Sequence, residues 1–220
     1  MPKEIPTFPA NFHALGPAQE SRTYHIPLIT PLFGGGVEPR VNSERFPIRE
    51  TSIRGHLRFW WRATCGRRFT DLSALWRREE EVFGSTEFPS PLQVKVEDFS
   101  PKPPVFLDAF AFNRSGPGGY AVSALQSGDR VIREELLFRL KMTWKSVQQL
   151  ARQRKAQNQL RVKANENELP ADVSDIADEL REAIWAWVNF GGLGGRTRRG
   201  CGSLLGKEVD DKGNVVRELV

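Results

Sequence analysis

The chain has 220 residues, of which 39% are hydrophobic, and its formal net charge at pH 7 is +5. This is enough to bury the core of one large domain or two small ones, and a positive charge gathered in arginine clusters favours a polyanionic partner such as nucleic acid. Two cysteines, Cys65 and Cys201, are too few for a disulfide framework or a cysteine-ligated metal, which is typical of a reducing compartment. The chain has no apolar run near the roughly 20 residues of a membrane span and no signal-peptide pattern, so we expect a cytoplasmic protein with no membrane segment. We also expect no metal or other cofactor.

The first half of the chain predicts an arm, a strand and two helices. Residues 1–20 hold four prolines and no apolar period, so they are interpreted as a proline-rich arm. Alternating apolar residues over 23–33 predict a strand, which is expected to stop near Pro27 because proline has no amide hydrogen to donate. Apolar residues at four-residue intervals over 48–65 predict an amphipathic helix, and a shorter helix is expected over 72–83.

The middle of the chain predicts two strands separated by an insertion. Alternation over 92–97 and again over 136–142 is typical of half-buried strands. Residues 100–130 are rich in Pro, Gly and Ser, which indicates an inserted excursion rather than a core element.

The last third predicts two helices and a final strand. Residues 148–168 form a polar stretch, interpreted as a helix with a solvated end. Apolar spacing over 172–190 predicts a second amphipathic helix. Residues 203–209 predict a strand, with a turn at 211–214 that leads into a short partner strand.

Taken together, the elements predict an α+β fold of the ferredoxin-like (RRM-like) class. The order strand, helix, strand, strand, helix, strand is that of a four-stranded antiparallel sheet with two helices on one face. We expect a single domain over 1–220, with the arm and the excursion added to it.

A glycine-rich and arginine-rich segment follows the second amphipathic helix. Six of the twelve positions in 191–202 are glycine and three are arginine. The segment lacks the Lys and Ser/Thr of a Walker loop and comes after a helix rather than before one, which argues against nucleotide hydrolysis and dinucleotide binding. It is interpreted as a loop whose backbone approaches RNA phosphates, the alternative being a flexible basic turn. The predicted RNA-binding residues of the loop are Gly191, Gly192, Gly194, Gly195, Arg196, Thr197, Arg198, Arg199, Gly200 and Gly202.

The first helix carries a second basic signal. Residues 45–68 contain seven arginines and one acid, Glu50, and three of the arginines recur at four-residue intervals. Guanidinium groups bind phosphate bidentately and stack on bases, so the row is interpreted as a track for an RNA backbone. The alternative is that the arginines cover neighbouring aromatic residues or pair with acids. Trp60 and Trp61 are both expected in the core, although one of them could stack on a base.

Three stretches resemble one known family. The sequences TPLFGGG from Thr30, IRETSIRGHLRFWWRAT from Ile48 and FGGLGGRTRRGCGSL from Phe190 are similar to motifs of the RAMP superfamily of CRISPR proteins, and most of all to the first-numbered RAMP subunit of the type III-B Cmr effector complex. The three motifs span nearly the whole chain in the family order.

The resemblance implies a noncatalytic RNA-binding subunit. It implies contact with guide RNA, target RNA or both near the 3′ end of the guide, with other Cmr-type RAMP subunits as partners. By position, the basic helix of the family corresponds to Arg49, Arg54, Arg58 and Arg62, and its loop to 191–202. Family members usually hold two such domains and this chain resembles the first, so it is either a compact variant or one that needs a partner chain.

Two other functions stay open. Some RAMP relatives cut guide precursors with a histidine, and His56 lies between two arginines, as metal-free RNA cleavage requires. The first alternative is therefore an endoribonuclease that uses His56. The second is an assembly scaffold whose basic faces bind acidic protein surfaces.

Overall fold

The structure is a computed structural model that describes residues 19–34, 48–86, 89–98, 105–108, 130–132, 136–163, 165 and 175–219. The strands are β1 (Gln19–Pro27), β2 (Leu32–Phe33), β3 (Gln93–Asp98), β4 (Phe106–Asp108), β5 (Arg130–Ile132), β6 (Leu137–Lys145), β7 (Lys207–Val209) and β8 (Val215–Glu218). The α-helices are α1 (Glu50–Cys65), α2 (Leu72–Phe83), α4 (Val147–Lys163) and α5 (Ala177–Phe190), with short 3₁₀ turns η1 (Gly66–Arg68) and η3 (Thr197–Arg199).

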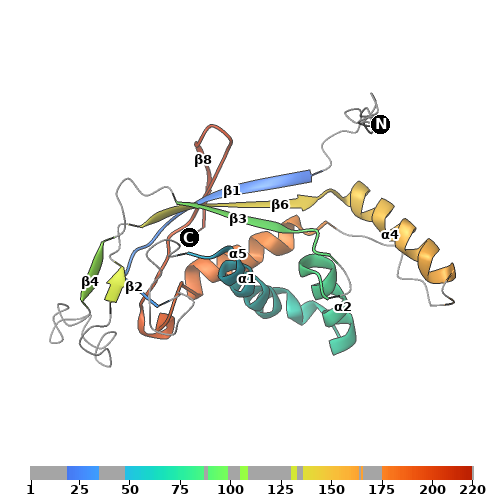
Figure 1. Cartoon of the computed structure of the whole chain (residues 1–220), viewed down its shortest axis with the longest axis horizontal. Coiled ribbons are helices and arrows are strands. Elements are labelled where there is room, and N and C mark those ends of the chain that lie inside the picture. Colours follow the sequence, from blue (N-terminus) through green and yellow to red (C-terminus); the bar gives the residue numbers. More distant parts are fainter. Residues whose placement is uncertain are drawn as a thin grey trace, which may run out of the picture. The chain divides into compact units, whose positions relative to one another are not determined.

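A five-stranded antiparallel sheet in the order β3-β6-β1-β7-β8 forms the centre of the fold. Helices α1 and α5 lie side by side on one of its faces (Figure 1). The first four strands of this order, with α1 and α5, make the expected ferredoxin-like arrangement, which confirms the predicted fold class. The hairpin partner β8 extends the sheet by one strand beyond β7.

The strands follow the alternation of their sequences. Every second side chain of β6 is buried, and β6 pairs with β3 from Gln93↔Thr143 to Asp98↔Phe138. β1 ends at Pro27, as expected, and the carbonyl of this proline accepts a hydrogen bond of 3.1 Å from the amide of Leu205. Pro27 thus ends the strand, and its carbonyl still links β1 to the segment before β7.

The two sheet-covering helices bury their apolar stripes against each other and the sheet. The α1 stripe and the facing α5 stripe are almost fully inaccessible to water; they comprise Ile53, Leu57, Trp61, Cys65, Leu180, Ala183, Ile184 and Trp187. The side chain of Asp71 accepts a hydrogen bond from the Ala74 amide at the start of α2. Periodicity therefore predicted α1 and α5 to within a few residues and α2 at its observed bounds.

A second sheet of three very short strands, β2-β5-β4, was not predicted. Strands of two or three residues carry too little alternation to be distinguished from a loop. Residues 1–18 of the predicted arm and most of the predicted excursion over 100–130 lie outside the described residues, whereas Gln19 and Glu20 belong to β1.

Contacts divide the chain into two units. One comprises Ser21–Thr143 and Ile176–Val220 and contains both sheets, α1, α2 and α5. The other comprises Met1–Glu20 and Trp144–Asp175, and its main described element is α4. The expectation of a single domain over 1–220 stays a prediction.

Candidate nucleic-acid interface

The glycine loop, residues 191–202, is an ordered connection between α5 and the segment that leads to β7. The amide of Gly195 donates a hydrogen bond of 2.6 Å to the carbonyl of Phe33. The hydroxyl of Thr30 donates to the carbonyl of Gly200 at 2.6 Å and accepts from the amide of Ser203 at 2.8 Å. These bonds fix the loop on the chain segment that follows β1, so it has a defined shape rather than that of a flexible turn.

Two glycines of the loop are required by close packing. Gly194 and Gly202 have φ angles of +72° and +67°, in the left-handed region that other residues rarely adopt. A Cβ atom on Gly202 would overlap the carbonyl oxygen of Leu193, and one on Gly194 would lie 2.6 Å from the carbonyl oxygen of Phe33. The glycines therefore serve the internal packing of the loop, whatever further contact they make with RNA.

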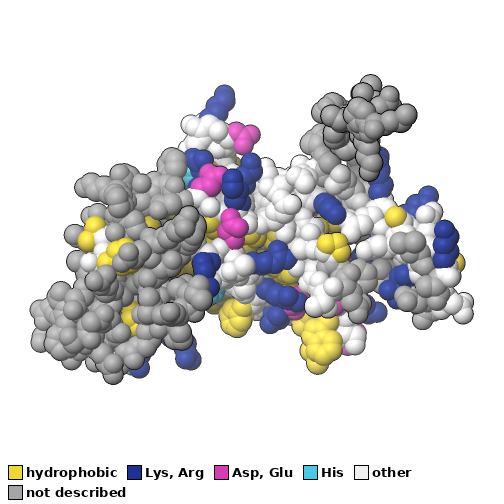
Figure 2. Space-filling model, in the orientation of Figure 1, with side chains coloured by type: hydrophobic (Ala, Val, Ile, Leu, Met, Phe, Trp, Pro, Cys, Tyr) yellow, Lys and Arg dark blue, Asp and Glu magenta, His cyan; other side chains and the backbone are white. Residues whose placement is uncertain are grey.

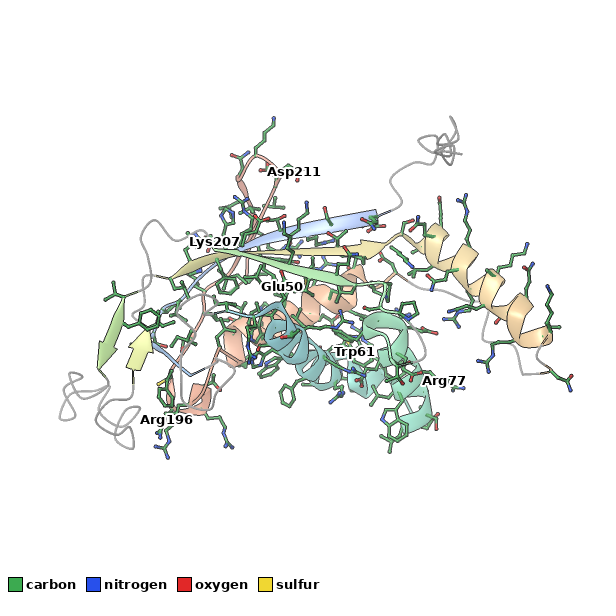
Figure 3. The ribbon with its side chains drawn as sticks, viewed as in Figure 1. Glu50, Trp61, Arg77, Arg196, Lys207 and Asp211 are labelled. Atoms are coloured by element: carbon green, nitrogen blue, oxygen red, sulfur yellow. The ribbon has the colours of Figure 1, made fainter. Side chains whose placement is uncertain are left out.

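The arginines of the loop project from this fixed backbone. Arg196, labelled in Figure 3, adopts φ +61°. Its guanidinium carbon lies 5.6 Å from the centre of the Phe33 ring in a cation–π arrangement. Arg198 and Arg199 lie in η3 and are exposed. Within the described ranges, neither Arg196 nor Arg198 forms an ion pair. The loop thus presents cationic groups that carboxylates of the described fold leave unneutralised.

Three of the four predicted α1 arginines bind protein groups instead of standing free. Arg54 donates to the carbonyl of Leu92 at 3.0 Å and to the carbonyl of Phe83. Arg58 and Arg62 share one carboxylate, that of Glu79 on α2. The row therefore joins α1 to α2 and to the segment before β3, which is the acid-pairing alternative considered for it. The side chains of Arg58 and Arg62 remain 39% and 48% exposed.

Glu79 is the centre of this ion-pair cluster. Glu79 is only 4% exposed to solvent. Burial acts to raise the pKa of Glu79, but hydrogen bonds from Arg62 and Arg58, together with their charges, hold the pKa below its ordinary value. Desolvation by burial, and then the charge of Arg58, lower the pKa of Arg54. Sequence reasoning missed Glu79 as the partner of Arg58 and Arg62.

The start of α1 and the glycine loop nevertheless meet at one cavity. It has a volume of about 150 Å³ and is lined by Leu32, Ile48, Arg49, Ser52, His56, Leu193 and Gly194. The Nε of Arg49 is buried and has no hydrogen-bond partner in the part of the chain that the structure describes. The cavity thus combines a guanidinium, a hydroxyl, an imidazole and the backbone of the glycine loop. Of the four arginines predicted for the basic helix, Arg49, which immediately precedes α1, is the one that lines this cavity.

His56 is held in the cavity wall by an aromatic neighbour. Its ring lies parallel to that of Trp187, with centroids 6.0 Å apart and an interplanar angle of 12°. The indole nitrogen of Trp187 in turn donates to the carbonyl of Gly192 at 3.1 Å. Burial lowers the pKa of His56, so the imidazole is neutral near pH 7. A neutral imidazole can accept or donate one hydrogen bond, or act as a base.

A cluster of aromatic side chains from α1 and α5 adjoins the start of the glycine loop. Trp60 contacts Phe59 edge-on and Phe190 at a tilt, with centroid distances of 5.3 and 6.2 Å, and Phe190 contacts Trp185 at 5.4 Å. Phe59 and Phe190 are 58% and 66% exposed. Trp61 is fully buried as expected, but the expectation of a buried Trp60 is wrong, because Trp60 is only partly covered. Figure 2 shows exposed hydrophobic side chains beside Lys and Arg side chains over α1 and α2.

The described residues contain no group of three or more His, Cys, Asp or Glu side chains placed to hold a metal ion. None of the described helices is long and apolar enough to cross a membrane.

The RAMP superfamily matches residues 25–204, a span that contains α1 and the whole glycine loop. The chain belongs to the RAMP superfamily. This confirms the resemblance inferred from the three motifs.

Individual relatives of this RAMP chain come from CRISPR systems. It is 29% identical over 199 residues to the CRISPR system Cmr subunit Cmr1-2 of Pyrococcus furiosus, a match that covers 82% of this chain and 92% of the relative. The crystal structure of apo Cmr1 from Pyrococcus furiosus is similar with a TM-score of 0.57 and 22% identity, over 90% of this chain and 50% of that chain. The chain therefore spans half the length of the solved Cmr1. A chain of a type IV-B CRISPR complex is similar with a TM-score of 0.50 and 13% identity, over 90% of this chain and 95% of that one.

Proposed function

We propose that this RAMP chain is a noncatalytic RNA-binding subunit of a type III-B Cmr effector complex. In this role it contacts guide RNA, target RNA or both near the 3′ end of the guide, and it acts in antiviral defence in the cytoplasm beside other Cmr-type RAMP subunits. The relationship to the Cmr subunit of Pyrococcus furiosus supports the assignment to the complex.

The observation that carries the RNA-binding role is the cavity between the start of α1 and the glycine loop. An unpartnered guanidinium nitrogen of Arg49 and the hydroxyl of Ser52 suit phosphate and ribose oxygens. Arg196 and Arg198 add positive charge on the adjacent loop. For Arg54, Arg58 and Arg62, RNA contact competes with the hydrogen bonds that they already make to protein groups.

The proposal is tested by measuring the affinity of the full chain for a fluorescein-labelled single-stranded RNA of 20 nucleotides over a series of salt concentrations. The logarithm of the binding constant should fall linearly with the logarithm of the salt concentration, because phosphate contacts release counterions. Arg198→Glu should weaken binding about tenfold or more, since it removes a charge-assisted contact and adds repulsion. Arg77→Glu is the matched control, because Arg77 is also exposed but lies on α2. Equal losses in both variants, or an affinity indifferent to salt, would contradict the proposal.

A second pair of variants separates binding from stability within α1. Arg49→Gln should weaken RNA binding and leave the unfolding midpoint nearly unchanged, because the Arg49 Nε has no protein partner to lose. Arg58→Gln should lower the unfolding midpoint and leave RNA affinity nearly unchanged, because it breaks the contact with Glu79. The opposite pattern would restore the arginine row of α1 as the RNA track.

An endoribonuclease remains the second candidate, because His56 lines the same cavity as Arg49. Cleavage of a labelled repeat hairpin in EDTA, lost in His56→Ala, would establish it and would rule out the noncatalytic role. An intact hairpin after long incubation removes this candidate. If the chain binds partner proteins in nuclease-treated lysate regardless of Arg198→Glu, and binds no RNA, the scaffold function replaces both.

A further inference from the structure

Helix α4 carries a concentrated positive charge that the proposed site does not use. It belongs to the unit formed by Met1–Glu20 and Trp144–Asp175. Its 17 residues include no Asp or Glu. They include five cationic side chains: Arg152, Arg154, Lys155, Arg161 and Lys163.

Two features that commonly stabilise a surface helix, a buried apolar stripe and internal ion pairs, are absent from the described residues of α4. None of its described side chains is buried, and Val147 and Val162 are 37% and 54% exposed. A helix that is polar all round usually depends on oppositely charged pairs three or four residues apart, but α4 has no acid to supply one. At the start of the helix, the Ser146 carbonyl accepts a hydrogen bond from the Leu150 amide at 2.9 Å. The side chain of Lys145 donates to the side chain of Gln153 at 2.7 Å, which adds another positive charge beside α4.

Part of the charge lies on one exposed face. Arg152, Lys155, Gln159 and Lys163 follow one another at intervals of three, four and four residues and are all exposed. At 1.5 Å of rise per residue this face is about 16 Å long. Arg152 and Lys155 are like charges one turn apart, which destabilises the isolated helix and is relieved by an anionic partner.

The chemistry of α4 suits a nucleic-acid backbone better than a protein surface. Its other polar side chains are the amides Gln148, Gln149, Gln153, Gln157, Asn158 and Gln159, which together with Arg and Lys are donors to phosphate and ribose oxygens. It has no aromatic residue, whereas protein interfaces are usually anchored by Trp, Tyr and buried Arg.

We propose that α4 is a second polyanion-binding element, which binds the sugar-phosphate backbone of RNA through the face formed by Arg152, Lys155, Gln159 and Lys163. It is formed by residues other than those of the cavity and the glycine loop. That the polyanion is RNA rests on the proposed function, whereas the site itself rests on the charge and exposure of α4.

The test uses the full chain and a fluorescein-labelled oligouridylate of 20 nucleotides. Arg152→Glu/Lys155→Glu should weaken binding about tenfold or more and make the plot of log binding constant against log salt less steep by about 1.4, which is about 0.7 for each lost phosphate contact on a single strand. The matched control, Lys212→Glu/Arg217→Glu, makes the same change of charge at exposed positions of the β7–β8 hairpin and should stay within twofold of the wild type. Glutamate is a good helix former, and circular dichroism should show unchanged helix content in both variants.

Each outcome decides the proposal. If the affinity of the α4 variant for oligouridylate stays within twofold of the wild type, α4 is not an RNA-binding element. The same conclusion follows if the control variant loses as much affinity as the α4 variant. Equal affinity of the wild type for poly-L-glutamate and oligouridylate at one ionic strength also overturns it, in favour of an acidic protein partner. Arg198→Glu, measured in parallel, separates the two proposals. A loss only in Arg198→Glu overturns the α4 site alone, a loss only in the α4 variant overturns the loop site alone, and no binding by the wild type overturns both.

Discussion

At the residue scale, the glycine loop depends on single positions that accept no side chain. Gly202→Ala should lower the free energy of unfolding by about 3 kcal/mol, because alanine is strained at positive φ and its Cβ would also overlap the Leu193 carbonyl. Gly200→Ala is the control: φ is +85° there too, but nothing lies within 4 Å of an added Cβ, so a loss of about 1 kcal/mol is expected. Urea denaturation measures both. Similar losses would show that backbone strain alone, and not packing, requires glycine at position 202.

Glu79 is the second residue with a sharp expectation. Because its pKa in the folded protein is lowered, its carboxylate stabilises the fold above the unfolded-state pKa of about 4.3, and this contribution is lost as the pH falls through the folded pKa. Glu79→Gln should therefore lower the free energy of unfolding at pH 7 by about 1–2 kcal/mol, a modest value because Arg58 and Arg62 are partly exposed. The difference in unfolding free energy between Glu79→Gln and the wild type should become smaller as the pH falls from 5 to 3.

The control for Glu79 is its neighbour on the same helix. Glu80 forms no ion pair within the described ranges, so Glu80→Gln should change the unfolding free energy by less than about 0.5 kcal/mol at either pH. A difference between wild type and Glu79→Gln that stays constant with pH would mean that the lost contribution is packing rather than charge.

The same cluster shows where prediction from sequence stopped. The spacing of Arg54, Arg58 and Arg62 correctly placed them on one side of α1. Their acceptors are Glu79 and two carbonyls that lie between 17 and 38 residues away in sequence, and helical periodicity contains no information on such distant contacts. The glycine loop shows a similar limit. Its composition predicted an irregular loop, but it did not predict that the loop packs on the segment from Thr30 to Phe33.

At the element scale, the pairing of α1 with α5 holds the cavity in place. Leu57 on α1 is fully buried, so Leu57→Ala should lower the free energy of unfolding by about 2–5 kcal/mol through lost burial and the space that it leaves. Phe59→Ala, two residues further on, should lower it by less than about 1 kcal/mol, because that ring is 58% exposed and mainly contacts Trp60. Thermal denaturation of both variants checks the difference. A large loss in Phe59→Ala would show that the aromatic cluster is part of the core rather than a surface feature.

Elements with long periodic patterns were the ones that could be predicted. The α1 and α5 stripes recur over three or four turns, and each repeat reflects the burial of one continuous side of a helix. β2, β4 and β5 owe their pairing to neighbours rather than to their own two or three residues. Helix α4 was predicted as well, but a role in binding was not, because the polar stretch was interpreted only as a helix with a solvated end.

At the scale of the whole molecule, two basic regions are proposed for one kind of ligand. A strand long enough to occupy both gains affinity from the second contact through a high effective concentration, whereas a short strand occupies only the tighter of the two. The glycine loop is the tighter site if its cavity takes part of the ligand, because α4 offers only surface charge.

RNA length should therefore separate the two regions. For oligouridylate of 20 nucleotides, both Arg198→Glu and Arg152→Glu/Lys155→Glu should weaken binding about tenfold or more. For oligouridylate of 6 nucleotides, Arg198→Glu should keep its effect, and the α4 variant should fall within twofold of the wild type. Fluorescence anisotropy at one salt concentration measures all four combinations. Equal losses in the α4 variant for both lengths would contradict the expectation that a short strand occupies only the glycine loop.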